Sequence, residues 1–276
     1  MKWIVIFAIL IAVAYGIPRT APDFSNRIQQ NLRTKFRGRI VGGTPADISS
    51  FPHMLALYDL SSTGFICGAS IIADRWALSA AHCLYFRVDP SLINLRGGST
   101  YHASGGIIFY TESYTLHPQY KHSLKEFDIA IIHTMESSLM RGTNIQAIPL
   151  PGICQTDCCL TCPPDQVTTT GWGKNAVGSF PQNLFQITLP IVDRQSCSAT
   201  WNGIGQMFFC VQNLVGKDSC SGDSGSPIVK KIGTQMMQIG IVSFGTTVCG
   251  DGTKPSVATR VELPEIRNWI TSMSGI

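Results

Sequence analysis

Short runs of β-branched and other apolar residues alternate with turn-forming residues along most of the chain from residue 40 onward. This spacing is typical of an all-β sandwich or barrel and not of a helical bundle. The 26 Gly and 15 Pro residues agree with a chain that turns often. The strands predicted from these runs include Met54–Tyr58, Ile66–Ile72, Asp128–His133, Gln186–Leu189, Gln238–Ser243 and Val257–Val261.

The apolar spacing changes to a helical period only near the C-terminus. Ile266, Trp269, Ile270 and Met273 recur at intervals of one, three or four residues, so they share one face of a helix. Pro264 suits the first helical turn, where its missing N–H costs nothing. An amphipathic helix is therefore predicted over Leu263–Met273.

The first 39 residues have a pattern of their own. Lys2 precedes 13 unbroken apolar residues, Trp3 to Tyr15, and Gly16 supplies a small residue at the usual cleavage spacing. A transmembrane helix needs about 20 apolar residues. We therefore predict a signal peptide over 1–16, a secreted, extracellular protein and no membrane partner. Residues 17–39 form a polar spacer with six basic residues, and the spacer ends at Arg39.

The formal net charge of +4 belongs to this N-terminal segment. Residues 1–39 hold seven of the 21 Lys and Arg and one of the 17 Asp and Glu, which leaves 14 basic and 16 acidic residues in 40–276. A body with a net charge of −2 and no basic stripe does not predict nucleic-acid binding. Secretion also places all ten Cys where disulfides persist.

Three short motifs carry the candidate chemistry. Residues 78–83 read LSAAHC, residues 128–132 read DIAII and residues 218–227 read DSCSGDSGSP. Each motif alone has a plain structural interpretation, as a turn, a strand or a loop. Together, in the order His, Asp, Ser and within a secreted β-rich chain, they resemble the trypsin/chymotrypsin family of serine proteases.

The resemblance covers residues 40–276 and implies a fold. We expect an all-β protein of two antiparallel six-stranded β-barrels packed together, about 40–150 and 151–260, with a C-terminal α-helix. The resemblance also implies a serine endopeptidase that hydrolyses peptide bonds through an acyl-enzyme. His82, Asp128 and Ser224 are the expected catalytic residues. No cofactor and no metal are expected.

The expected roles follow from the chemistry of these side chains. A serine hydroxyl is a weak nucleophile at neutral pH and needs a base within hydrogen-bond reach. His82 would take the proton from Ser224, and Asp128 would orient the imidazole and stabilise its charged form. The backbone N–H groups of Gly222 and Ser224 would bind the oxyanion.

Residues 39–43 read RIVGG and resemble the activation site of the family. Cleavage after Arg39 would release a propeptide, 17–39, and create an α-amino group on Ile40. The resemblance pairs that group with Asp223, which lies directly before the nucleophile. A buried carboxylate without a partner is costly, so the pair would form only after cleavage by an activating trypsin-like protease.

A primary specificity pocket is expected around Asp218, six residues before the nucleophile. A carboxylate at the base of the pocket favours Lys or Arg in the substrate. The family usually has Gly where Ser256 stands, so a side chain here would narrow the pocket near its floor, and its hydroxyl is able to hydrogen-bond Asp218. The expected substrate-binding residues are Asp218, Ser219, Ser243, Phe244, Gly245 and Ser256.

Three disulfides are implied by the resemblance: Cys67–Cys83, Cys197–Cys210 and Cys220–Cys249. A further cluster, Cys154, Cys158, Cys159 and Cys162, is unusual for the family. Local disulfides are the favoured interpretation of the cluster, with three pairings open. A zinc site and a cross-link between chains are the alternatives.

The expected partners are polypeptide substrates, the activating protease and protein inhibitors, and the protein is expected to be a monomer with a digestive role. Three alternatives stay open. They are chymotrypsin- or elastase-like specificity, a regulatory protease that cuts one partner, and a protease-like binding protein that has lost catalysis.

Overall fold

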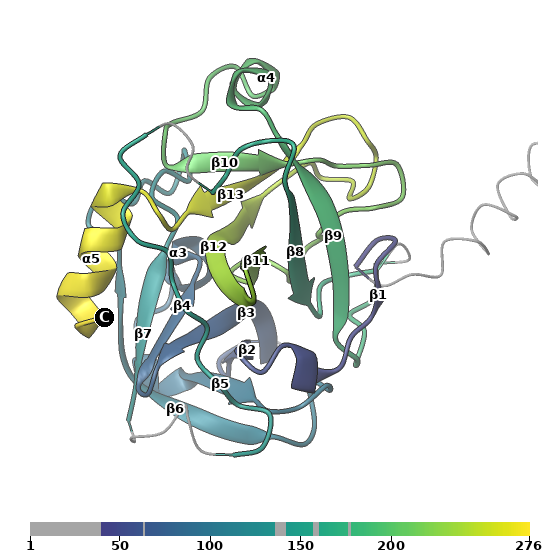
Figure 1. The fold of residues 1–276 in the computed structure, drawn as a ribbon. Coiled ribbons are helices and arrows are strands. Elements are labelled where there is room, and N and C mark those ends of the chain that lie inside the picture. Colours follow the sequence, from purple (N-terminus) through teal and green to yellow (C-terminus); the bar gives the residue numbers. More distant parts are fainter. Residues whose placement is uncertain (1–39, 63, 136–141, 157–159, 176–177) are drawn as a thin grey trace, which may run out of the picture. The chain divides into compact units, whose positions relative to one another are not determined.

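The computed structural model describes residues 40–62, 64–135, 142–156, 160–175 and 178–276, coloured in Figure 1. The predicted signal peptide and propeptide lie outside the described residues. Residues 40–276 fall within one compact unit, and the description below is of that unit.

Two closed antiparallel barrels make up most of this unit. In the first barrel six strands follow the order β2-β3-β4-β7-β6-β5 and close on themselves. Figure 1 shows it in purple to blue. Its strands are β2 (Met54–Asp59), β3 (Gly64–Ala73), β4 (Trp76–Ser79), β5 (Ile93–Gly97), β6 (Ile107–Leu116) and β7 (Ala130–Thr134).

The second barrel follows the order β9-β10-β13-β12-β11-β8 and closes through the pairing of β8 with β9. A short seventh strand, β1 (Thr44–Pro45), pairs onto the outside of β9 at Gln186 and Phe185. The other strands are β8 (Gln166–Gly171), β9 (Phe185–Val192), β10 (Phe208–Val211), β11 (Pro227–Ile232), β12 (Gln235–Phe244) and β13 (Ser256–Arg260).

Strand β9 illustrates why these residues form a barrel. Phe185, Ile187, Leu189 and Ile191 occur at every second position, and all four are buried in one core cluster of the second barrel. Successive side chains of a strand point to opposite faces, so this alternation places the four apolar side chains inside. The polar or exposed positions between them face outward.

The helices are short and lie at the ends of strands. The 3-10 turns η1 (Ile48–Ser50) and η2 (Pro90–Leu92) and the helices α3 (Ala81–Leu84) and α4 (Arg194–Thr200) connect strands, and α5 (Pro264–Ser274) ends the chain. Ile266 and Ile270 of α5 are fully buried in the core cluster that contains Leu78 and Ile131 of the first barrel. Helix α5 follows the second barrel in sequence, yet it covers the first (Figure 1).

The predicted fold is confirmed, and so are the element types. Each of the six predicted strands overlaps a strand, and the predicted helix 263–273 matches α5, with Leu263 as its N-cap and Pro264 in its first turn. The boundary drawn for the first barrel needs one correction. Ile40 and β1 belong to the second barrel, because Ile40 is buried in its core and β1 pairs with β9.

Within the described residues no helix has the length and apolar character to cross a bilayer.

A buried ion pair joins β13 to the segment that leads into β8. Arg260 Nη2 donates to Glu262 Oε1 at 3.0 Å, and both side chains are at most 2% exposed. Glu262 also accepts from Leu160 N at 3.1 Å and from Thr161 Oγ1 at 3.0 Å. Three polar groups share this carboxylate, and its removal leaves a buried guanidinium without its charge partner.

Glu262→Ala is expected to lower the free energy of unfolding by about 3–5 kcal/mol, the usual cost of breaking a buried pair from one side. Urea unfolding followed by tryptophan fluorescence measures the change. Glu265→Ala is the matched control, since Glu265 is exposed on the first turn of α5. Equal stability of the two variants would contradict a structural role for the Glu262 carboxylate.

Candidate active site

His82 lies on the short helix α3, which begins directly after β4. Its ring atom Nδ1 is 2.7 Å from Asp128 Oδ2, and its backbone N–H donates to Asp128 Oδ1 at 2.8 Å. The same carboxylate therefore holds both the ring and the backbone of His82. This double contact fixes the direction in which the imidazole points.

Asp128 is fully buried, and its environment keeps it ionised. Burial alone raises the pKa of a carboxylate, but the hydrogen bond and positive charge of His82, together with a hydrogen bond from Ser243, hold the pKa of Asp128 below its ordinary value. Ser243 Oγ donates to Asp128 Oδ2 at 2.5 Å. Thr259 Oγ1 donates to the Asp128 carbonyl at 3.0 Å. Two strands of the second barrel, β12 and β13, therefore each hydrogen-bond Asp128.

Ser224 lies on the loop before β11, against β3 and the end of β4. Its carbonyl accepts from Gly68 N at 2.8 Å. The next residue, Gly225, packs so closely that an added Cβ would lie 2.3 Å from Gly68 O and from Ser79 Oγ. The added Cβ would also lie 3.1 Å from the backbone N of Ala80, so the loop that carries Ser224 lies close to the start of α3. Among the described residues, no hydrogen bond joins the Ser224 hydroxyl to His82.

The loop also leaves two backbone donors free. Among the described residues, neither the N–H of Gly222 nor that of Ser224 donates a hydrogen bond within the protein. Gly222 has a φ of +98°, and an added Cβ would lie 2.6 Å from the ring of Phe180. Only glycine fits both requirements. The geometry therefore presents two backbone donors next to the Ser224 hydroxyl.

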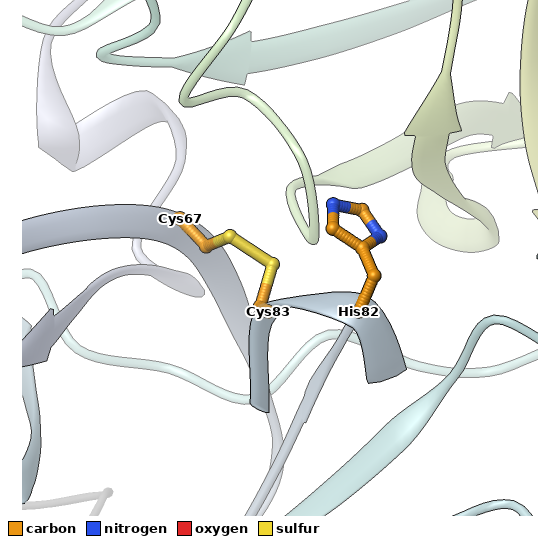
Figure 2. A group of neighbouring side chains, drawn as sticks. All are labelled: Cys67, His82 and Cys83. Carbon is orange, nitrogen blue, oxygen red and sulfur yellow. A yellow bond between two sulfur atoms is a disulfide. The ribbon is translucent and has the colours of Figure 1, made fainter. Parts of the chain in front are cut away.

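The Cys67–Cys83 disulfide braces the histidine. Figure 2 shows the bridge joining β3 to α3, with the His82 ring extending from α3 beside it. One ring nitrogen of His82 and the two sulfur atoms lie within 4.8 Å of one another, a spacing that a metal site also has. Both sulfur atoms are already bonded to each other, so they offer no thiolate to a metal.

Asp223 is fully buried on the loop between the pocket and Ser224. Its two carboxylate oxygens accept from Gly173 N and Cys220 N, each at 2.8 Å. Burial nevertheless raises the pKa of Asp223 to about 7, because two neutral donors do not offset the loss of water around a full charge. Ile40 is also fully buried, and Val41 pairs with Asp218, five residues before Asp223.

A pocket of about 220 Å³ opens beside Ser224. Its lining includes all six residues expected to bind substrate: Asp218, Ser219, Ser243, Phe244, Gly245 and Ser256. Asp218 is 1% exposed, and burial raises the pKa of its carboxyl to about 6 despite hydrogen bonds that lower it. A carboxylate at this position is a strong attractor for a cation that enters the pocket.

Ser256 makes the contact that its position suggested. Its hydroxyl donates to Asp218 Oδ1 at 2.6 Å, while Gly250 N donates to Oδ2 at 3.3 Å. Phe244 packs edge-on against Trp201 and Phe208, at 5.3 and 5.5 Å between ring centroids. These contacts pack the pocket wall at Phe244 against Trp201 and Phe208.

The structure contains the disulfides Cys197–Cys210 and Cys220–Cys249 as well. Cys220–Cys249 ties the loop that carries Ser224 to the loop that precedes Ser256. In the cysteine cluster, Cys154 and Cys162 are each in a disulfide, which agrees with the favoured interpretation. The pairing stays open, because Cys158 and Cys159 lie outside the described residues.

Three contacts of the site were not predicted. The hydroxyl of Ser243, expected only in the pocket wall, bonds Asp128; Thr259 bonds the carbonyl of the same residue; and Phe180 packs on Gly222. No local pattern marks Thr259 or Phe180. Both act across barrels or loops that are distant in sequence, so only the tertiary fold reveals them.

Comparison with known proteins agrees with this geometry. The family model described as Trypsin matches residues 40–270. The chain is 33% identical to trypsin Tyr p 3.0101 of Tyrophagus putrescentiae, over 98% of this chain and 90% of that protein. It is 33% identical to trypsin Blo t 3 of Blomia tropicalis, over 100% and 98%. It is 32% identical to trypsin alpha of Drosophila melanogaster, over 98% of both chains.

A match over most of the chain, with relatives that align over nearly their whole length, establishes the family. The chain belongs to the trypsin/chymotrypsin family and is a serine endopeptidase.

Proposed function

We propose that this endopeptidase is secreted as an inactive precursor and, once cleaved between Arg39 and Ile40, hydrolyses peptide bonds after Lys or Arg. The observation that carries the specificity is the buried carboxylate of Asp218 in the pocket beside Ser224. A cationic side chain entering this pocket meets a negative charge that has been removed from water. The attraction between such groups is much stronger than at the surface.

The proposed mechanism is acyl transfer by Ser224. His82 accepts the proton of the Ser224 hydroxyl as the hydroxyl attacks the substrate carbonyl, and later gives this proton to the leaving amine. Asp128 stabilises the imidazolium, and its low pKa supports the role because it stays charged. The hydrogen bond from Ser224 to His82 forms when substrate binds, as catalytic contacts often tighten only in the complex.

The negative oxygen of the tetrahedral intermediate would lie between the N–H groups of Gly222 and Ser224. Their lack of other hydrogen bonds among the described residues supports this role. Such donors are aimed before the reaction begins, so they cost no reorganisation when the charge develops. Water then attacks the acyl-enzyme while His82 accepts its proton, and His82 returns this proton to the Ser224 oxygen as the acid product leaves.

Activation would work through the buried charge of Asp223. Cleavage before Ile40 creates an ammonium group on a residue that is buried in the same barrel. Ile40 has a φ of +46°, which is strained for a β-branched residue, and cleavage abolishes this torsion because it removes the preceding carbonyl. Release of strain and formation of an ion pair both favour the cleaved, ordered state.

The signal peptide 1–16 and the short propeptide 17–39 support secretion and a digestive role on polypeptide substrates. Protein inhibitors that fill the pocket with a basic residue are expected partners, and a monomer is the expected state.

Ser224→Ala and His82→Ala are each expected to lower kcat of the activated enzyme by about 10⁴-fold or more, because the nucleophile and its base act as a unit. An organophosphate should label wild-type Ser224 and not the Ser224→Ala protein. Ser62→Ala, on an exposed turn of the first barrel, is the control. If the activated wild-type protein does not label, the chain is a binding protein instead of an enzyme.

The preference for a cationic substrate is expected to titrate with Asp218. Above pH 6 the carboxyl is charged and attracts Lys, and below pH 6 it is neutral, since its pKa is raised to about 6. The ratio of kcat/KM for a Lys substrate to that for its norleucine analogue should fall about tenfold from pH 7 to pH 5. A ratio below one throughout would favour a chymotrypsin- or elastase-like pocket.

Activation is expected to require cleavage at Arg39 alone. After treatment with a trypsin-like protease, the wild-type chain should begin at Ile40 and hydrolyse substrate, whereas Arg39→Gln should stay inactive. Arg37→Gln is the matched control and should activate normally, because a cut after Arg37 leaves Ile40 acylated. N-terminal sequencing and a chromogenic amide measure both steps. Activity of the Arg39→Gln protein equal to wild type would refute this mechanism.

A further inference from the structure

The Ser256 hydroxyl lies against Asp218 in the pocket, where it affects whether lysine or arginine of a substrate binds better. It donates to Asp218 Oδ1 at 2.6 Å, and Ser256 itself is 4% exposed. The other oxygen, Oδ2, accepts from Gly250 N. Each carboxylate oxygen therefore already has one donor before any substrate arrives.

We propose that Ser256 makes the pocket selective for lysine over arginine in the substrate. The inference rests on the proposed preference for basic residues and narrows it to one of them. Two features support the inference. The first is the number of hydrogen bonds that the Asp218 oxygens are still able to accept, and the second is the width of the pocket in front of this carboxylate.

The first feature concerns hydrogen bonds. A guanidinium pairs best with a carboxylate through two parallel N–H···O bonds, one to each oxygen. With Ser256 on Oδ1, this fork finds only one oxygen that is free of a side-chain donor. An ammonium is a compact charge with three donors that point in different directions. It needs only one carboxylate oxygen and is able to donate to the hydroxyl oxygens of Ser256 and Ser219, which line the same pocket.

The second feature concerns width. Gly245 lies beside Ser256, and a Cβ built on it would be 3.0 Å from Ser256 Oγ. The Ser256 side chain thus takes up space in the pocket lining that a glycine at this position would leave open. A planar guanidinium with its two terminal nitrogens is wider than an ammonium, so the narrowing obstructs arginine more than lysine.

Ser256 is held in this position by the strand that carries it. It is the first residue of β13, and it pairs with Val211 of β10. The Ser256 backbone would therefore have to break its pairing with β10 to move away from Asp218. Rotation of the side chain away from Asp218 would leave a buried hydroxyl without a partner, which is unfavourable.

The test compares amide substrates that differ only in the cleaved residue, Lys or Arg, on the activated full-length protein at pH 8. Ser224→Ala carried through the same activation gives the background of the activating protease. We expect kcat/KM for Lys to exceed that for Arg by about tenfold, the effect of one charge-assisted hydrogen bond. Ser256→Gly should shift the ratio toward Arg by a similar factor, and Ser256→Ala should shift it in the same direction.

Ser62→Gly makes the same chemical change on an exposed turn of the first barrel and should leave the ratio unchanged. Equal or faster cleavage after Arg by the wild-type protein would overturn the inference and leave the broader preference for basic residues standing. An unchanged ratio in Ser256→Gly would also overturn it. Cleavage after norleucine or Phe but after neither basic residue would instead remove the proposed specificity itself.

Discussion

Buried negative charge is the constraint on which the site depends. Asp128, Asp218 and Asp223 are each at most 1% exposed, and each has lost most of its water. Of these three, only Asp128 has a partner among the described residues that can carry a positive charge, and only its pKa is lowered. Burial raises the pKa values of Asp218 and Asp223, to about 6 and about 7, and the neutral donors that face them offset this rise only in part. Two of the three carboxylates therefore favour the arrival of a cation.

This difference suggests one physical logic for three separate steps. In the proposed mechanism His82 would supply the cation for Asp128 when it takes a proton during catalysis. A basic substrate side chain would supply it for Asp218, and the amino group of Ile40 would supply it for Asp223. A buried carboxylate without a counter-charge is costly, so each arrival lowers the free energy of the state that contains it. In each of these proposed steps, binding, activation and catalysis, a cation would neutralise the charge of a buried carboxylate.

The barrels hold these charges in place through contacts that cross between them. Ser70 Oγ of the first barrel donates to Gln238 Oε1 of the second at 2.7 Å, and both residues are fully buried. Ser243 and Thr259 extend from the second barrel to Asp128, whereas Ser224 is tied back to Gly68. Since the groups that react come from both barrels, their distance is set by this shared packing and not by a flexible loop alone.

Local sequence predicted the parts of the structure that local physics determines. Runs of β-branched and apolar residues between turns predicted β9, and helical spacing predicted α5. The motifs around His82 and Asp128 predicted two residues that hydrogen bonds join in the fold. The sequence did not predict that Ile40 and β1 join the second barrel, or that Thr259 bonds Asp128. These contacts join residues far apart in the chain. Each becomes favourable only once both barrels have closed.

The same reasoning bears on the alternative of an apolar pocket. A Phe or Leu side chain in this pocket would displace water from Asp218 and supply no charge, so the carboxylate would lose solvation without compensation. Ser256 lowers this free-energy cost because its hydroxyl already donates a hydrogen bond to Asp218 Oδ1. A proton on Asp218 would remove most of the rest, and with the pKa near 6 that proton is available in mildly acidic solution. Apolar substrate residues are therefore disfavoured most strongly at neutral and alkaline pH, where the Asp218 carboxylate is charged.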